Sequence, residues 1–346
     1  FSIDIVPHYV IESTSKMLSA VDRTPFHQKY VTEHLGGKQD EVRLLKQFLK
    51  GAGIYGAELR RKGFSGYLCE LLVIQYGSFA GVLESARNWK IGTYITINTS
   101  RDNAFYDPLV VIDPVDVNRN VAAAVSLDSF STFIDSARSF IENPCTQCFF
   151  PREVPPLDEN ALRNILKKRK TALFGVKFTL PDLVDDVAYP QLERASRGVQ
   201  STLRRHDFRE LRGDIYYDRG NALLLFEMLV WELPAVKRHM GPSADSKRHA
   251  KNFKDTYESN PTVLTGPFIE EGRYVIEIQR KFTSFPQLVK SEYQTMRSSE
   301  AIRQAMGRGF NVLRDEELLY DPTLGFFLAR FFNRTLNNCD RAHRSQ

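Results

Sequence analysis

Prolines concentrate between residues 144 and 156, and they separate two stretches of chain with different hydrophobic patterns. Before this segment, from about residue 36 to 142, apolar side chains recur mostly at the spacing of amphipathic helices. After it, predicted strands and helices alternate. The change of period at a proline-dense boundary predicts an α+β chain with a mostly helical middle and a mixed C-terminal part.

Local signals predict where the individual elements begin and end. In the helical middle we expect a helix from Asp40 that ends at Gly51, a buried strand at 109–112, and further helices at 65–78, at 81–89 and from the cap Ser126 to about 141. In the C-terminal part we expect strands at 173–180, 213–217 and 222–231, basic helices at 191–206 and 245–257, a hairpin turning near 271–272, and helices from there to the end. No internal repeat accompanies these patterns.

Composition excludes several classes of protein. A length of 346 residues suggests two or three domains at about 150 residues each, and 42% hydrophobic with 26% charged residues is typical of a globular chain. The longest apolar runs fall far short of the ~20 residues that a membrane span requires. The net charge of +5 suits an enzyme that holds a polyanion. Four cysteines in so long a chain indicate a reducing compartment such as the cytoplasm.

The first seven residues read as a strand that is already in progress, and the chain opens on Phe1 rather than Met. We therefore expect a fragment of a longer protein. Asp4 lies between two isoleucines on this strand, where a carboxylate can face a site while its neighbours face the core. Such strand carboxylates hold Mg²⁺ in nucleotidyl transfer. The alternative is an acidic residue on a solvated strand face.

Four further residues could bind a triphosphate together. Thr24, His27 and Lys46 offer a hydroxyl, an imidazole and an ammonium, and Tyr55 offers a ring beside the base or sugar. Each also has a structural explanation: Lys46 as a solvated helix-edge residue, Tyr55 as a core residue, and His27 as a loop cap. Composition and spacing do not decide between these alternatives.

Arg119 follows a buried strand and precedes the start of an Ala-rich helix in this interpretation. A buried guanidinium there requires an acidic partner, which Asp113 or Asp116 could supply, or a ligand. Cys145 and Cys148 have the spacing of half a zinc site, but no second pair follows, so we do not expect a metal there. Basic residues interleaved with aromatic ones in the second half suit RNA contacts, or are solvated helix faces.

Several segments in order resemble the archaeal, class I CCA-adding enzymes. They are Ser-Ala-Val-Asp-Arg-Thr-Pro-Phe-His at 19–27, Glu-Val-Arg-Leu-Leu-Lys at 41–46, Gly-Ile-Tyr-Gly-Ala-Glu at 53–58, Gly-Phe-Ser-Gly-Tyr-Leu-Cys-Glu-Leu-Leu at 63–72, Tyr-Gly-Ser-Phe at 76–79, Asp-Pro-Val-Asp-x-x-Arg-Asn-Val-Ala-Ala at 113–123, Asp-Asp at 185–186, Tyr-Pro-Gln-Leu-Glu-Arg-Ala-Ser-Arg at 189–197 and Met-Gly-Pro at 240–242. The match covers nearly the whole chain, and only the last ~40 residues match poorly.

The resemblance implies a tRNA nucleotidyltransferase that builds the 3′-terminal CCA of tRNA from CTP and ATP with Mg²⁺ and without a template. It implies that Asp4 is a catalytic, metal-binding carboxylate, and that Arg119 reads the base edge and helps to reject UTP. It places Thr24, His27, Lys46 and Tyr55 around the triphosphate and sugar. The C-terminal part would clasp the acceptor stem and TΨC arm of tRNA. No membrane partner is implied, and a homodimer is compatible with the resemblance.

The resemblance also divides the chain. Residues 1–35 would be the remnant of a nucleotidyltransferase sheet, residues 36–150 a helical nucleotide-binding domain, and residues 151–346 an α/β tRNA-binding body with a helical tail. The family's Gly-Ser motif and paired carboxylates have no counterpart before Asp4. Because one carboxylate cannot hold two Mg²⁺ ions, we expect these 346 residues alone to be inactive and the parent protein to be active. The alternatives are an enzyme similar to poly(A) polymerase or oligoadenylate synthase, and a non-catalytic RNA-binding module.

Overall fold

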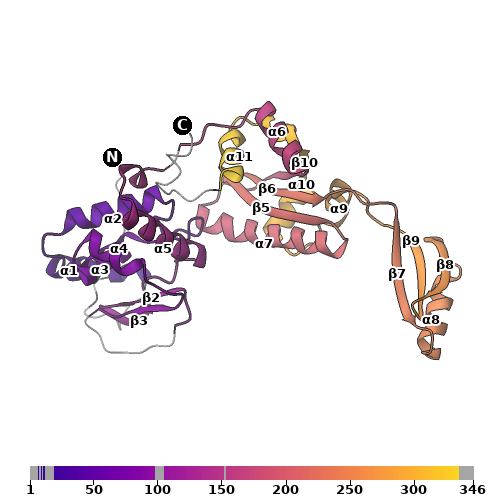
Figure 1. The fold of residues 1–346 in the computed structure, drawn as a ribbon, viewed down its shortest axis with the longest axis horizontal. Helices are drawn as coiled ribbons and strands as arrows, with labels where there is room; N and C mark the ends of the chain where they lie inside the picture. The colour runs from indigo at the N-terminus through magenta and orange to yellow at the C-terminus, as the bar shows by residue number, and fades with distance from the viewer. Residues whose placement is uncertain are drawn as a thin grey trace. The chain divides into compact units, whose positions relative to one another are not determined.

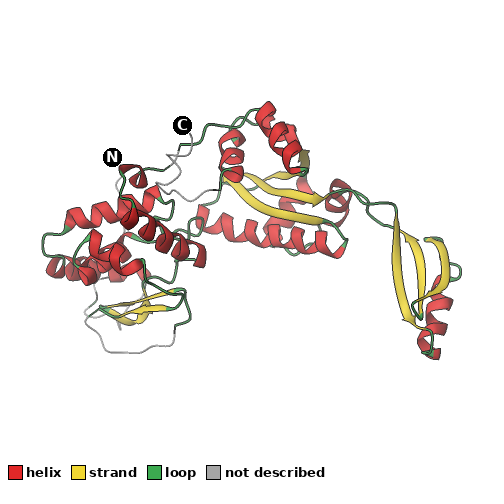
Figure 2. Ribbon diagram, viewed as in Figure 1, coloured by secondary structure: helices red, strands yellow, loops and turns green. Residues whose placement is uncertain are grey.

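The computed structural model describes residues 19–97, 105–151 and 153–334, together with Pro7, Tyr9 and Ile11. Asp4 and the predicted strand around it lie outside the described residues. The described chain forms two compact units, the first ending at Val154 and the second spanning Pro155–Phe332. Helices and sheets occur in both units, which confirms the α+β fold class (Figures 1 and 2).

The first unit is mostly helical. Its elements are the 3-10 helix η2 (Ala20–Arg23), α1 (Thr24–His34), α2 (Gln39–Gly51), α3 (Gly66–Tyr76), α4 (Phe79–Ala86), β1 (Thr93–Ile95), β2 (Leu109–Asp113), β3 (Asp116–Asn120), α5 (Leu127–Glu142) and the 3-10 helix η3 (Thr146–Phe149). β2 pairs in parallel with β1 and antiparallel with β3. The core lies between the helices, and Phe48, Phe64 and Phe133 are almost completely buried in it.

Serine caps set the starts of three of these helices. The hydroxyls of Ser65, Ser78 and Ser126 each accept a hydrogen bond from the amide three residues later, which satisfies one of the free donors of the first turn. Gly77 ends α3 with φ +84°, a conformation that favours glycine. The predicted starts of α3 and α5 are thereby confirmed. The third predicted helix, 81–89, is present as α4, but it begins earlier, at Phe79, because Ser78 caps it.

The predicted helix end at Gly51 is confirmed, and this glycine also allows close packing. It is the last residue of α2, and a Cβ built on it would lie 2.0 Å from the carbonyl oxygen of Cys148. The positive φ that follows the helix belongs to Gly53 (φ +75°). Glycine at position 51 therefore allows α2 and η3 to pack with their backbones in contact.

The second unit is built on an antiparallel sheet with the strand order β10-β4-β6-β5. Its elements are α6 (Glu159–Arg169), β4 (Ala172–Thr179), α7 (Asp185–Arg205), β5 (Arg209–Asp218), β6 (Asn221–Val230), α9 (Phe285–Glu292), α10 (Glu300–Arg308), β10 (Phe310–Arg314), the 3-10 helix η4 (Asp315–Tyr320) and α11 (Leu324–Phe332). Successive residues of β6 enter different clusters: Leu224 and Phe226 pack with α7 and α9, and Leu223 and Leu225 pack with α6 and α11. Both faces of the sheet are therefore covered by helices (Figure 2).

A second, smaller sheet with the order β7-β9-β8 belongs to the same unit. It comprises β7 (Val236–Ser243), β8 (Val263–Glu270) and β9 (Arg273–Gln279), with α8 (Lys247–Tyr257) packed against it (Figure 1). Phe253 of α8 stacks near His239 and lies over Gly241, where a Cβ would come within 2.7 Å of the ring. This confirms the basic helix and the hairpin predicted for this region.

Three predictions, two in the second half and one in the first unit, were wrong. The helix expected from residue 191 begins at Asp185, with Pro190 inside it, because burial of Ala188 and Leu192 on one face outweighs the backbone hydrogen bond that proline removes. The stretch expected to be helical to the end contains the strand β10, which pairs with β4. Residues after Arg119 form turns and not a helix, and Arg119 itself lies on β3.

Within the described residues, no single helix has the length and apolar character of a membrane span. The helices α3 and α4 have that length and apolar character only when taken together, and a 90° bend separates them.

Candidate nucleotide site and RNA-binding groove

The centre of the candidate site is Asp113, the last residue of β2. The sequence Leu-Val-Val-Ile-Asp of this strand is completely buried, so that the carboxylate ends a hydrophobic strand with 0% exposure. The chain then turns into β3, and the amide of Val115 donates to Asp113 Oδ1 at 3.1 Å. A charge in such a place needs several donors, because an unpaired buried carboxylate is strongly destabilising.

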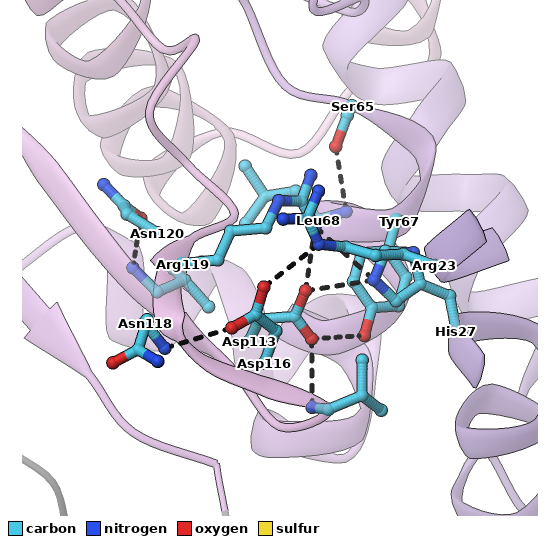
Figure 3. A network of polar contacts seen from close by, with 12 residues as sticks. Arg23, His27, Ser65, Tyr67, Leu68, Asp113, Asp116, Asn118, Arg119 and Asn120 are labelled. Atoms are coloured by element: carbon cyan, nitrogen blue, oxygen red, sulfur yellow. Dashed lines mark hydrogen bonds and ion pairs between the residues drawn. The ribbon is translucent and has the colours of Figure 1, made fainter. Parts of the chain in front are cut away.

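Three side chains from three other elements meet that need (Figure 3). Arg119 of β3 donates from Nη1 to Oδ2 at 2.8 Å, and His27 Nε2 of α1 lies 3.0 Å from the same oxygen. The Tyr67 hydroxyl of α3 donates to Oδ1 at 3.0 Å. Burial alone would raise the pKa of Asp113, but the hydrogen bonds from His27, Arg119 and the Val115 amide outweigh it and hold this pKa below its ordinary value. The carboxylate is therefore ionised and accepts only.

Tyr67 orients His27 as well as Asp113. The two rings stack with their centroids 3.9 Å apart and a 17° angle between their planes. Burial and the neighbouring Asp113 raise the pKa of Tyr67 well above its ordinary value, so the hydroxyl keeps its hydrogen and remains a donor. The His27 imidazole is thus fixed both by its ring face and by one ring nitrogen.

A second carboxylate and an amide complete the β2–β3 hairpin. Asp116 accepts from Arg23 Nε at 3.0 Å and from the Asn118 amide at 3.3 Å. The buried side chain of Asn120 accepts from the amides of Val111 and Ala122, both at 2.9 Å, and donates to the carbonyl oxygen of Leu109. Asn120 therefore replaces backbone pairing where the hairpin becomes irregular.

A cleft of about 590 Å³ opens beside this network. It is lined by Arg23, Ala57, Ser65, Phe105, Asp107, Asp116, Asn118, Arg119, Asn120, Val121, Ala123 and Ala124. The Arg119 side chain is 35% exposed, and in the described part of the chain its hydrogen bonds use Nη1 alone, so Nε and Nη2 remain available to a ligand.

Lys46 and Tyr55 come together in a separate cluster at the start of α3. Lys46 Nζ donates to Glu70 Oε1 at 2.8 Å, and a Cβ on Gly66 would lie 3.4 Å from Nζ and 3.5 Å from the Tyr55 hydroxyl. Partial burial alone would lower the pKa of Lys46, but Glu70 outweighs it and raises this pKa. Burial raises the pKa of Tyr55. Because Gly66 has no side chain, the Lys46 ammonium and the Tyr55 hydroxyl can both lie against its backbone.

A metal site in a protein needs several ligand side chains that converge on one point. Among the described residues, no group of three or more His, Cys, Asp or Glu side chains is placed to hold an ion. Cys145 and Cys148 lie with their sulfur atoms 3.1 Å apart. The resemblance places the Mg²⁺ site at Asp4, which lies outside the described residues.

The second unit has a basic groove along α7, with a volume of about 630 Å³. Its lining includes Arg194, Arg197, Arg205 and Arg297 and contains no acidic residue. Gly198 lets the helix contact the 297 backbone, since a Cβ there would lie 2.1 Å from the Arg297 carbonyl oxygen. Close packing at Gly198 therefore brings Arg297 of the loop to the same groove as the arginines of α7.

Comparisons with known proteins agree over both units. The model of the tRNA nucleotidyltransferase second domain matches residues 40–150, and the model of the C-terminal domain of CCA-adding enzymes matches residues 169–315. A CCA-adding enzyme of Methanosarcina acetivorans is 39% identical over 333 residues, which cover 96% of this chain and 73% of that protein. The enzyme of Archaeoglobus fulgidus is 40% identical over 325 residues, covering 92% and 72%. The chain belongs to the CCA-adding enzyme family.

Family membership confirms the resemblance, while the roles of individual residues stay predictions. The structure brings His27 and Arg119 together on Asp113, and it brings Lys46 and Tyr55 together beside Glu70. Thr24 is exposed at the start of α1, one turn before His27. Of the two partners expected for Arg119, Asp113 is the one observed.

Sequence reasoning missed Tyr67, Glu70 and Arg23. Tyr67 and Glu70 lie one turn apart in the first turns of α3, which begins after the cap Ser65. The cap predicts the start of the helix, and the three-residue spacing then places both side chains on neighbouring positions of its surface. Arg23 carried no signal, because its partner Asp116 is distant in sequence.

Proposed function

We propose that this protein is a tRNA nucleotidyltransferase that adds or repairs the 3′-terminal CCA of tRNA, using CTP and ATP without a template. Membership of the CCA-adding family supports the reaction. The observation that carries it to this chain is the Arg119 guanidinium, held by Asp113 with free donors at the cleft. Enzymes that add long A tails are not favoured, because the relatives and the C-terminal model carry the CCA-adding name.

In this proposal the nucleotide is bound at two places. The planar Arg119 fork donates to the edge of cytosine or adenine, and its geometry selects against uracil. Lys46 neutralises the triphosphate, with Thr24, His27 and Tyr55 around the phosphates and sugar. An ammonium has three hydrogens, so Lys46 can keep its bond to Glu70 and still donate to phosphate oxygens. The tRNA 3′-hydroxyl attacks the α-phosphate and pyrophosphate leaves, so one bond to phosphorus forms as another breaks.

A divalent cation is expected for nucleotidyl transfer, and we propose Mg²⁺, with Asp4 as one ligand. Bound Mg²⁺ would neutralise charge on the phosphates. A single carboxylate does not complete an octahedral shell, so further oxygen ligands would have to come from other residues, the nucleotide or water.

We also propose that the α7 groove binds the phosphate backbone of tRNA. Arg194 and Arg297 have exposed side chains with no hydrogen bond or ion pair to another described residue, and the groove offers no carboxylate to repel phosphate. Arginine forks match phosphate geometry. Three further parts of the proposal rest on the sequence alone. They are a division into domains at 1–35, 36–150 and 151–346, a cytoplasmic location, and a homodimer.

The reaction is tested by transfer of labelled CTP and ATP to tRNA transcripts that end before CCA, using the natural protein that carries this chain. Addition that stops after the terminal A is expected. Continued A addition, or no addition at all, would refute the proposed function.

The groove is tested by tRNA minihelix binding over a range of salt concentrations. Replacing Arg194 and Arg197 by alanine should weaken binding and lower the salt slope by about one per lost phosphate contact. Arg163→Ala, on the exposed part of α6 and paired with Glu316, is the control and should leave the slope unchanged. An unchanged slope in the double variant would exclude the groove.

A further inference from the structure

Asp113 is too deeply buried to touch a substrate, yet two of its hydrogen bonds come from residues of the proposed nucleotide site. It is 0% exposed, and its donors are the Val115 amide, Tyr67, His27 and Arg119. Two of these, His27 and Arg119, are the residues proposed above for the triphosphate end and the base end of the nucleotide. They share a single acceptor atom, Oδ2.

Sharing one oxygen links the positions of the two side chains. Because Asp113 is an ionised acceptor, His27 Nε2 must carry a hydrogen, and Arg119 Nη1 always does. The 3.5 Å between Nε2 and Nη1 is therefore a contact of two donors that converge on the same atom, and not a hydrogen bond between them. A displacement of either donor changes the geometry available to the other.

The carboxylate also reduces the freedom of Arg119. An arginine that is 35% exposed has many rotamers in water, and ordering it on binding costs affinity. The bond from Nη1 to Asp113 fixes the plane of the guanidinium before the nucleotide arrives, and leaves Nε and Nη2 for the ligand. On the opposite side of Asp113, the Tyr67 hydroxyl holds Oδ1, so the carboxylate cannot rotate freely.

We propose that Asp113 is the positioning residue for nucleotide selection, and that it couples the base-reading Arg119 to His27 through one shared oxygen. This inference rests on the proposed function. It assigns no contact with substrate to Asp113, which acts only through the two side chains that it orients.

The test is the ratio of kcat/KM for CTP to kcat/KM for UTP, measured with the natural protein on tRNA lacking CCA. In Asp113→Asn an amide group replaces one acceptor oxygen, so the ratio should fall about tenfold, towards that of Arg119→Ala. Adding Asp113→Asn to Arg119→Ala should lower the ratio no further, because the carboxylate selects the base only through that arginine. The kcat/KM for CTP itself should fall further in the double variant, since His27 also loses its anchor.

Tyr67→Phe is the milder variant. It keeps the stacked ring and removes one hydrogen bond to Asp113, and the ratio should fall by about threefold. If Asp113→Asn does not fold, as judged by circular dichroism, Tyr67→Phe decides the matter alone.

Glu227→Gln is the matched control, since Glu227 is an equally buried carboxylate that also accepts from arginine, here Arg169 and Arg212, but in the other unit. It should destabilise the protein and leave the CTP-to-UTP ratio unchanged. The inference is overturned if folded Asp113→Asn and Tyr67→Phe both keep the unmodified ratio, or if Asp113→Asn and Arg119→Ala lower it independently. If the unmodified protein transfers no nucleotide, it is the proposed function that fails.

Discussion

Replacing Glu227 by glutamine should destabilise the second unit by about 3 kcal/mol. The Glu227 side chain is fully buried on β6, where it accepts from Arg169 at 2.6 and 3.1 Å, from Thr171 at 2.8 Å and from Arg212 Nε at 2.9 Å. Removing one partner of a buried pair costs about 3–5 kcal/mol, because the remaining charge is uncompensated. The Arg169 side chain is 38% exposed and can turn to water, so the lower end of this range applies.

The assay is a urea titration followed by tryptophan fluorescence. The chain has two tryptophans, Trp89 in the first unit and Trp231 directly after β6. A Trp89→Phe background therefore leaves a reporter of the second unit alone. With a slope of about 2 kcal/mol per molar urea, a loss of 3 kcal/mol moves the midpoint down by roughly 1.5 M.

The control is Glu316→Gln, which breaks an exposed ion pair with Arg163 and should cost less than about 1 kcal/mol. A Glu227→Gln midpoint no lower than that of Glu316→Gln would refute the reasoning, because buried and exposed pairs would then be equivalent.

Acid should weaken the same unit. Burial alone would raise the pKa of Glu227, but hydrogen bonds and charges from Arg169, Thr171 and Arg212 outweigh it and lower this pKa below its value of about 4.5 in the unfolded chain. The ionised glutamate therefore contributes stability above pH 4.5, and this contribution is lost as the pH falls through the folded pKa. The midpoint of Glu227→Gln should depend less on pH in that range, and an equally steep dependence would count against the assignment.

Two further predictions concern the first unit and use Trp89 as the reporter in a Trp231→Phe background. Gly51→Ala should cost about 2 kcal/mol or more, because its Cβ would lie 2.0 Å from the Cys148 carbonyl oxygen; a midpoint unchanged in urea would contradict that contact. Asn120→Ala should cost about 3 kcal/mol and speed hydrogen exchange at the amides of Val111 and Ala122, which lose their acceptor. The exposed Asn118→Ala should stay within about 0.5 kcal/mol, and equal losses at the two positions would be contrary to this explanation.

Helices of the first unit could be predicted from sequence because their determinants are local. The spacing of Val42, Leu45 and Leu49 specifies the buried face of α2, and Ser65 and Ser126 mark where α3 and α5 begin. Neither signal depends on a partner distant in the chain.

Strands with remote partners could not be predicted in this way. β3 reads Asp-Val-Asn-Arg-Asn, with no apolar alternation, and it is a strand because Asn120 bonds it to β2. The candidate site shows the same limit. Asp113 and Arg119 are near in sequence, and their pairing was one of two alternatives, whereas His27 reaches Asp113 from 86 residues away. Tertiary packing of α1 and α3 creates that contact, and no sequence period reports it.

The late position of β10 in the chain has a consequence for folding. β5 and β6 are joined by a short turn and can pair as soon as both are synthesised, whereas β4 meets its outer partner only after the small sheet, α9 and α10 have been made. Pairing across such a separation is slow, and an unpaired edge recruits strands from other chains. β10 therefore covers the edge of β4, and a chain that stops before Phe310 should form the β5–β6 hairpin normally yet aggregate on refolding.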